Sequence, residues 1–395
     1  MSFTTLPTEL KLEIMGYLDP TSCFNIAISC KEHWDTFRSL VETHSRLISE
    51  NNPFHVGAIS DSRIFEIIDS PRLGWYVRDC ILEHSEYGDQ NDTVENFDLD
   101  DLYVPNRETA NFEAEKARLN NDYSKWMKNE RLHGKPIAYQ GREIITLVTV
   151  LMHHLPFLTT LSISSGSSFR FLIDAVEEDE MPFLNFMHVL AKAYIQSSSA
   201  QQIRDLPFSH LTTVAIARGD YLFTRTDWCS HFLYIPTLRN FVGRRLAGTY
   251  DCHENEFVKK PAEPSWDEDT KLEKYNLEFA HPLYKEAPYS KVEELLFLEA
   301  KVDMFVLNDI LSRTPSLRRF SYQANDVLYE SEAKAFAYCP KKIFLSLLKH
   351  TSQSLEQLTL EDPGGLAVSI RLCYPMPGHA LTLIEHQKRT RQRNA

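Results

Sequence analysis

A short apolar pattern recurs along this chain and constrains its fold more than any other feature. Large apolar residues stand at the first, fourth and sixth positions of the pattern, most clearly at Leu158, Leu161 and Ile163 after an apolar helix over 144–151. One helix followed by one strand cannot bury its own apolar face, whereas stacked units can. The sequence therefore predicts a stack of helix–strand units, whose other copies begin at Val77, Leu211, Leu238, Val292, Leu317 and Leu355.

The spacing of these copies favours an irregular solenoid of the leucine-rich-repeat type. Most copies begin near multiples of about 26 residues from one another, which is within the range of such repeats. Because most strands are reached through a helix, neighbouring strands should run parallel. The alternative is an ordinary α/β domain whose buried strands resemble one another. The asparagine or cysteine that these repeats carry after the strand is present only at Asn325, so the register between units is left open.

The first fifty residues predict three short helices. Pro7 suits a first helical position, where its missing N–H costs nothing, and Asp19-Pro20 should end one helix and begin the next. A module of this size buries little apolar surface by itself. It is therefore either a cap on the following domain or a docking module for another protein. Its apolar residues recur at helical spacing, at Leu10, Ile14, Tyr17 and Leu18, and again at Trp34, Phe37, Val41, His44 and Ile48.

An ordered set of residues along this module resembles the F-box, in the form seen in many fungal F-box proteins. The set is Leu6-Pro7, Glu9-Leu10, Ile14, Leu18, Pro20, Phe24, Ala27, Ser29-Cys30-Lys31 and Trp34. The resemblance implies that the module binds a Skp-type adaptor, which links the chain to a cullin–RING ubiquitin ligase. The sequence alone does not separate adaptor-facing residues from the core of the module; the implied adaptor-binding residues are Leu6, Pro7, Leu10, Ile14, Leu18, Phe24 and Trp34.

The expected fold is α+β overall, with the three-helix F-box ahead of an irregular α/β solenoid with parallel strands. The solenoid resembles the leucine-rich-repeat-like domains of fungal F-box proteins. We expect the F-box at 1–50, a linker at 51–70, the repeat domain at 71–362 and a C-terminal tail at 363–395. Two segments of the repeat domain, near 83–140 and 249–288, lack the strand pattern and are expected to be insertions.

Composition and charge exclude several classes of partner. The formal net charge is −13, which argues against nucleic acid and anionic membranes. The sequence has no run of eighteen apolar residues, so we expect no transmembrane helix. The seven cysteines are scattered and form no C-x-x-C pair, which predicts reduced thiols in a cytoplasmic or nuclear protein.

The sequence contains no specific catalytic or metal-binding motif, so we expect no enzyme activity and no cofactor. P-loop, G-x-S-x-G and G-x-G-x-x-G sequences are absent. His153-His154 ends an apolar helix, where partly exposed histidines are more common than ligand pairs. The conceivable zinc ligands lack the close spacing of structural zinc sites; they are Cys229, His231, Cys252 and His253.

These expectations combine into one main functional hypothesis and two alternatives. In the first, the chain is the substrate-recognition subunit of a Skp–cullin–F-box ubiquitin ligase, and its repeat domain binds a target protein. In the second, it is an F-box scaffold that acts outside ubiquitination. In the third, which the missing motifs disfavour, it is an enzyme with a helical cap. The sequence does not identify the target.

Overall fold

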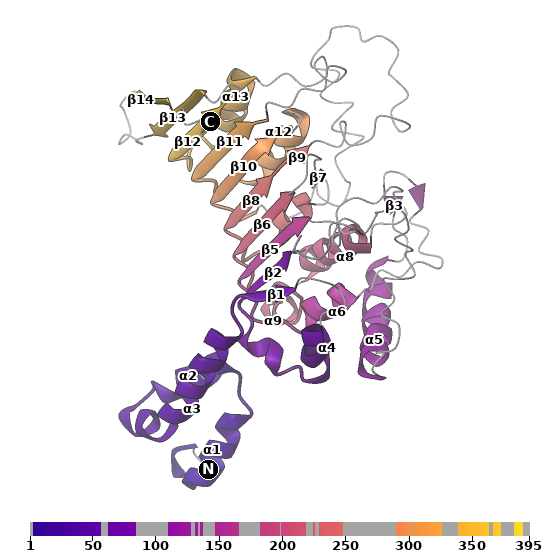
Figure 1. Ribbon diagram of the computed structural model, residues 1–395, viewed down its shortest axis with the longest axis vertical. Coiled ribbons are helices and arrows are strands. Elements are labelled where there is room, and N and C mark those ends of the chain that lie inside the picture. Colours follow the sequence, from indigo (N-terminus) through magenta and orange to yellow (C-terminus); the bar gives the residue numbers. More distant parts are fainter. Residues whose placement is uncertain are drawn as a thin grey trace, which may run out of the picture.

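The chain is a mixed α/β protein whose described residues form two main apolar cores, one within the N-terminal helices and one beneath a large sheet. It is known from a computed structural model (Figure 1). The structure describes residues 3–56, 62–83, 110–127, 131–132, 135–136, 147–165, 182–197, 199–218, 224–225, 229–247, 290–302, 304–325, 339–362, 366–372 and 383–389.

The N-terminal module contains the three predicted helices and projects from one end of the sheet (Figure 1). Its core joins Met15, Cys23, Ala27, Phe37 and Val41. None of these residues belongs to the core of the sheet, so the module is a packing unit of its own. Its elements are a short 3-10 helix η1 (Phe3–Thr5), α1 (Thr8–Gly16), α2 (Pro20–Ala27) and α3 (Lys31–Glu50).

Ten of the described strands form one open sheet, in the order β1-β2-β5-β6-β8-β10-β11-β12-β13-β14. Neighbours in this sheet follow each other along the chain, and every pair from β1 to β12 is parallel. The strands are β1 (Phe54–Val56), β2 (Asp79–Glu83), β5 (Thr160–Ser165), β6 (Thr213–Arg218), β8 (Asn240–Arg244), β10 (Glu294–Ala300), β11 (Arg319–Ala324), β12 (Gln357–Glu361), β13 (Leu366–Leu372) and β14 (Leu383–Arg389).

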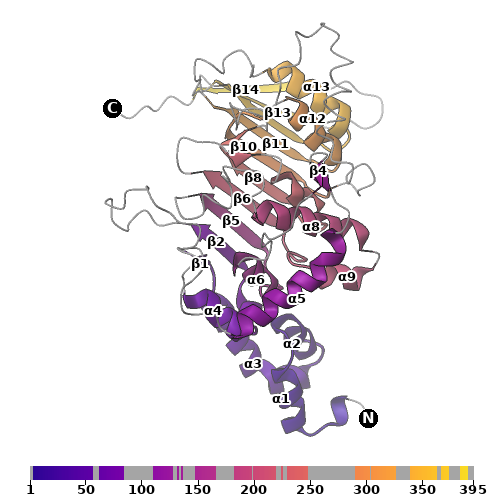
Figure 2. The same ribbon diagram turned by 90° about the vertical axis from the view of Figure 1, so that its right-hand side faces the viewer.

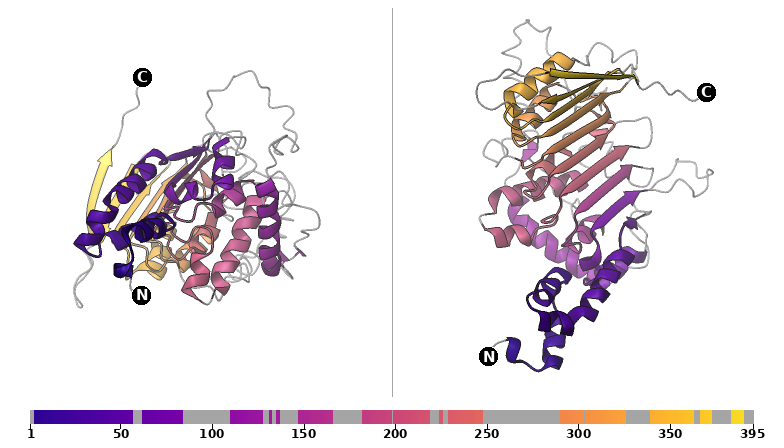
Figure 3. Two further views of the ribbon diagram at one scale, coloured as in Figure 1. Left: turned by 90° about the horizontal axis from the view of Figure 1, so that it is seen from below. Right: turned by 90° about the vertical axis from the view of Figure 1, so that its left-hand side faces the viewer.

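The described helices of this domain lie along one face of the sheet (Figures 2 and 3). When a helix connects two strands across one face of a sheet, it carries the chain back to the edge where the first strand began. The second strand therefore runs parallel to the first. The helices are α4 (Ser62–Asp69), η2 (Leu73–Tyr76), α5 (Ala110–Met127), α6 (Leu147–His153), α8 (Pro182–Gln196), α9 (Ala200–Arg204), η7 (Ser230–Tyr234), α12 (Met304–Arg313) and α13 (Pro340–Thr351).

Two rows of apolar side chains cross the sheet beneath the helices. Strand residues alternate between the two faces of a sheet, so the fourth and sixth positions of the sequence pattern both point toward the helices. The first row passes through Cys80, Leu161, Val214, Phe241, Leu295, Phe320 and Leu358, and the second through Leu82, Ile163, Ile216, Gly243, Phe297, Tyr322 and Leu360. Every residue in these rows is buried.

The first position of the pattern enters the strand through a turn that recurs along the sheet. The N–H of Leu158 donates to the carbonyl of Leu155, three residues earlier, at 3.2 Å. The same turn introduces the copies at Val77, Leu211, Leu238 and Leu317. A shared turn, a shared register and a shared burial pattern mark these segments as equivalent structural units.

The copy that begins at Leu238 has a glycine, Gly243, at its sixth position. The side chain of Leu246 explains why a large residue is not needed there. Gly243 stands in the row between Ile216 and Phe297. A Cβ atom on Gly243 would lie 2.2 Å from the Cδ1 atom of Leu246, and Leu246 is fully buried. A leucine three residues later therefore fills the space that the side chain at this position fills in the other units.

Two expected boundaries differ from the structure. Residues 51–70, expected as a linker, contain β1 and α4, and both contribute buried residues to the core of the sheet. Residues 363–395, expected as a tail, contain β13 and β14. These two strands pair antiparallel to β12 and to each other, so the expectation of parallel strands is wrong at this end of the sheet.

The two expected insertions have different outcomes. Within 83–140 the structure describes α5, which contacts α4, α6 and α8, and whose Leu119 is buried in the core. The segment 249–288 lies outside the described residues. Two short pairings stand apart from the main sheet; they are β3 (Arg131–Leu132) with β4 (Lys135–Pro136), and β7 (Thr224–Arg225) with β9 (Leu246–Ala247).

Candidate docking surface

The second helix of the module begins at the residues that the sequence indicated. The Asp19 carboxylate accepts hydrogen bonds from the backbone N–H groups of Thr21 and Ser22, at 2.9 and 3.0 Å. Pro20 occupies the first helical position, where it has no N–H to leave unpaired. The N-cap fixes the turn between α1 and α2, and with it the direction in which each helix presents its side chains.

The third helix buries a stripe shifted by one residue at its start. Its buried side chains are those of His33, Phe37, Val41 and His44, whereas the predicted stripe began at Trp34. Steps of four, four and three residues from His33 keep these side chains within about 80° of one another around the helix, whereas Trp34 lies about 100° from His33. Trp34 is left at the surface, with 36% of its side chain exposed.

The structure separates the seven implied adaptor-binding residues into two groups. Pro7, Leu10, Ile14, Phe24 and Trp34 are exposed. Leu6 is half-buried, and Leu18 packs against the module's core. Leu18 therefore contributes to the packing of the module, and the first group lies at its surface.

Exposed large apolar side chains are concentrated in this module. Among the described residues nine such side chains are exposed, and seven of them lie between positions 10 and 34: Leu10, Leu12, Ile14, Tyr17, Phe24, Ile28 and Trp34. Isolated exposed apolar residues are ordinary, but a concentration of them marks an interaction surface. We call Leu10, Ile14, Phe24, Ile28 and Trp34 the docking surface.

The first helix exposes apolar side chains on two flanks. Leu10, Ile14 and Tyr17 follow one stripe at steps of four and three residues, while Leu12 stands about 200° around the helix from Leu10. Leu12 and Ile14 are equally exposed, at 40% each. The sequence pattern identified the stripe but missed Leu12. It also missed Ile28, which was detectable as the residue four positions after Phe24 at the end of α2.

Aromatic and arginine contacts attach the module to the sheet domain. The Nδ1 atom of His44 and the hydroxyl of Tyr76 lie 3.1 Å apart, and their rings stack. Burial lowers the pKa of His44 and raises that of Tyr76, so both groups remain uncharged at neutral pH. The guanidinium of Arg72 lies over the rings of Tyr17 and Trp75. The module is thus packed onto the sheet domain through its third helix, at His44, and through the end of its first helix, at Tyr17.

The sheet offers a second surface, on the face away from the helices. Its middle row consists of small or aliphatic half-buried residues, namely Ile81, Ser162, Ala215, Val242, Leu296, Ser321 and Thr359. Along the edge where the strands begin, Arg239, Glu293, Arg318 and Glu356 alternate in charge, and consecutive members lie 3.6, 3.8 and 2.6 Å apart. Such exposed pairs contribute little stability, but they leave this edge close to neutral.

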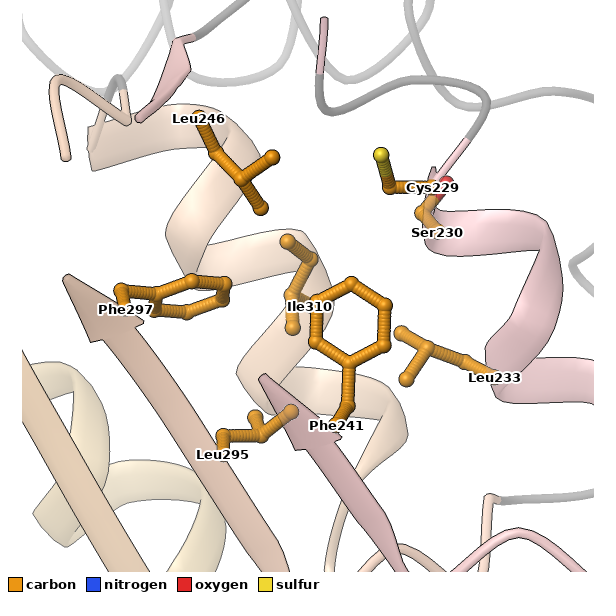
Figure 4. A pocket seen from close by; sticks show the side chains of 8 residues that line it. All are labelled: Cys229, Ser230, Leu233, Phe241, Leu246, Leu295, Phe297 and Ile310. Atoms are coloured by element: carbon orange, nitrogen blue, oxygen red, sulfur yellow. The ribbon is translucent and has the colours of Figure 1, made fainter. Parts of the chain in front are cut away.

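Two cavities among the described residues are smaller than a typical ligand pocket. One apolar cavity, of about 10 Å³, lies between β8, β10, η7 and α12 and is lined by Phe241, Phe297 and Ile310 (Figure 4). A polar one of about 130 Å³ lies near Phe54 and Arg63, where α3 meets the sheet domain. Sites for drug-sized ligands occupy about 300–1,000 Å³, and an apolar space for one water stays dry.

The structure gives no metal-binding cluster among the residues that it describes. No group of three or more histidine, cysteine, aspartate or glutamate side chains there could hold a metal ion. Cys229 and His231 are both buried, while Cys252 and His253 lie outside the described residues. Burial lowers the pKa of His153 to about 3, which keeps this ring neutral.

The described helices include none that is long and apolar enough to span a bilayer. No protein-family model matches the chain, and no curated protein matches it either.

Proposed function

We propose that this chain is the substrate-recognition subunit of a Skp–cullin–F-box ubiquitin ligase. The module of α1, α2 and α3 binds a Skp-type adaptor through the docking surface, and the sheet domain binds a target protein. The chain itself makes and breaks no bonds. It acts by holding a target near the transferring enzyme, which raises the effective concentration of the reacting groups.

The observation that carries the proposal is the concentration of exposed apolar side chains on the module. Burying Leu10, Ile14, Phe24, Ile28 and Trp34 against a partner would remove apolar surface from water, at about 25 cal/mol for each Å². None of these residues belongs to the core of the module, which consists of other side chains. The positions of four of them are among those that carry the F-box resemblance.

The sheet domain supports the second half of the proposal. Its strands follow each other in sequence order, its described helices share one face, and its units share a turn and a register. These properties favour an irregular leucine-rich-repeat-like solenoid, in which the opposite face of the sheet remains open to a partner. The antiparallel pair at its end takes the place of a capping unit.

The experiment compares two aspartate substitutions on the same helix. Ile14→Asp places a carboxylate within the docking surface, where binding would bury it without a partner charge, at a cost of several kcal/mol. Leu12→Asp makes the same chemical change at an equally exposed position on the other flank of α1. We expect Ile14→Asp to abolish co-purification of the adaptor and Leu12→Asp to retain it.

The proteins recovered with the tagged chain decide between the hypotheses. Adaptor together with cullin is the result expected for a ligase subunit. Adaptor without cullin would favour an F-box scaffold that acts outside ubiquitination. Undiminished adaptor with Ile14→Asp, in a variant whose circular dichroism matches the unmodified chain, would refute the docking surface.

A further inference from the structure

Consecutive units of the sheet are joined by a repeated pair of hydrogen bonds just before each strand. The N–H groups of Thr159 and Thr160 both donate to the carbonyl of Arg78 in the preceding unit, at 2.7 and 3.0 Å. The same pairing, two successive N–H groups on one backbone carbonyl, recurs at five further junctions. Its donor pairs there are 212 and 213, 239 and 240, 293 and 294, 318 and 319, and 356 and 357.

At the first junction a side chain replaces the backbone carbonyl. The N–H groups of Arg78 and Asp79 donate to the Oδ1 atom of Asn52, at 2.6 and 2.9 Å. The β1–β2 register pairs Phe54 with Cys80, which places Asn52 opposite Arg78. This is the position whose backbone carbonyl accepts the two bonds in the later units. Asn52 therefore ends the series with its side-chain oxygen.

The other end of the same side chain holds the docking module. The Nδ2 atom of Asn52 donates to the carbonyl of Ile48 in the last turn of α3 and to the carbonyl of Tyr76 at 2.7 Å. Carbonyls in the last turn of a helix have no partner within the helix. One amide thus joins the end of the docking helix, the turn before β2 and the first residues of β2.

We propose that Asn52 is a positioning residue that holds the docking module at a fixed orientation to the sheet domain. This inference rests on the proposed function, and it adds that the orientation between ligase and target is set inside this chain. Both ends of the amide are needed, because the oxygen accepts from the sheet while the nitrogen donates to the helix. His44 and Arg72 add packing at the same joint but do not reach the strand.

The test measures the distance distribution between two spin labels in the free chain. Genetically encoded labels at the exposed positions Ser39 on α3 and Gln357 on β12 avoid the native cysteines. Asn52→Asp retains the acceptor oxygen but replaces the donor with a second oxygen that repels the carbonyls of Ile48 and Tyr76. Asn52→Leu removes both functions.

We expect both Asn52 variants to broaden the distance distribution, while the unmodified chain gives a narrow one. Asn51→Asp is the matched control, because it makes the same chemical change one residue away. The Asn51 side chain donates to the carbonyl of Leu47 within α3. Amide hydrogen exchange distinguishes the role of the Asn52 oxygen from that of its nitrogen. Arg78 and Asp79 should exchange about tenfold faster in Asn52→Leu but not in Asn52→Asp.

Equal widths in Asn52→Leu and in the unmodified chain would overturn the inference. Equal broadening in Asn51→Asp would do so as well, because the effect would then belong to the end of α3 in general. Neither result depends on the adaptor. A refutation of the proposed function by the Ile14→Asp experiment and a refutation of the positioning role are therefore distinguishable.

Discussion

Replacement of Leu358 by alanine tests whether the sheet is the continuous core of the second domain. Leu358 has no exposed surface. It stands in register between Phe320 of β11 and Ile370 of β13. The substitution removes three buried carbons, which at about 0.8 kcal/mol each lose about 2.4 kcal/mol of transfer free energy. The remaining cavity raises the expected cost to about 2–5 kcal/mol, because a close-packed core relaxes only in part.

The matched control is Gln357→Ala, one residue earlier on the same strand. Gln357 is exposed, and surface substitutions of this kind stay within about 0.5 kcal/mol. Thermal unfolding followed by circular dichroism should show Leu358→Ala about 2–6 °C below Gln357→Ala. An unfolding entropy of about 2.1 cal/mol/K for each residue makes 1 kcal/mol correspond to about 1.2 °C in a chain of 395 residues. Equal melting temperatures for the two variants would refute the buried row, and with it the inward direction of the pattern's fourth position.

Two further predictions concern Gly74 and His153. Gly74→Ala should destabilise the chain by at least about 1–3 kcal/mol in urea unfolding, because a Cβ atom there would lie 1.7 Å from the carbonyl oxygen of His154; an unchanged midpoint would contradict this close approach. Burial lowers the pKa of His153 from 6.5 to about 3, so the unfolded chain binds a proton in this range that the folded chain does not. The stability that this histidine contributes is complete above pH 6.5 and is lost as the pH falls toward 3. Urea unfolding at pH 7 and 5 should show a smaller loss in His153→Gln than in the unmodified chain, and equal losses would count against the neutral buried ring.

Local chemistry made several elements predictable from the sequence. Asp19-Pro20 marks a helix start because the carboxylate and the proline ring act on their immediate neighbours. The strand copies at Leu161 and Leu358 were recognisable because alternation alone places every second side chain on one face. Their parallel pairing followed from the helices between them.

Short or edge strands were not predictable in this way. The strand Phe54–Val56 has only three residues, too few for the pattern, and it is a strand because β2 pairs with it. The antiparallel direction of β13 depends on how the chain turns after β12, which no apolar period encodes. The missing side chain at Gly243 is explained only by the tertiary structure, in which Leu246 fills the space.

The candidate docking surface was also predictable only in part from the sequence. The sequence by itself determined that residues 1–50 form helices with more apolar side chains than so small a core can bury. Only the tertiary structure decided that Leu18 turns inward while Ile14 stays exposed, because that choice depends on where α2 and α3 pack against α1. The role of Asn52 depends on tertiary structure in the same way. Its amide acquires these partners only when the fold brings together the end of α3 at Glu50 and the start of β2 at Asp79.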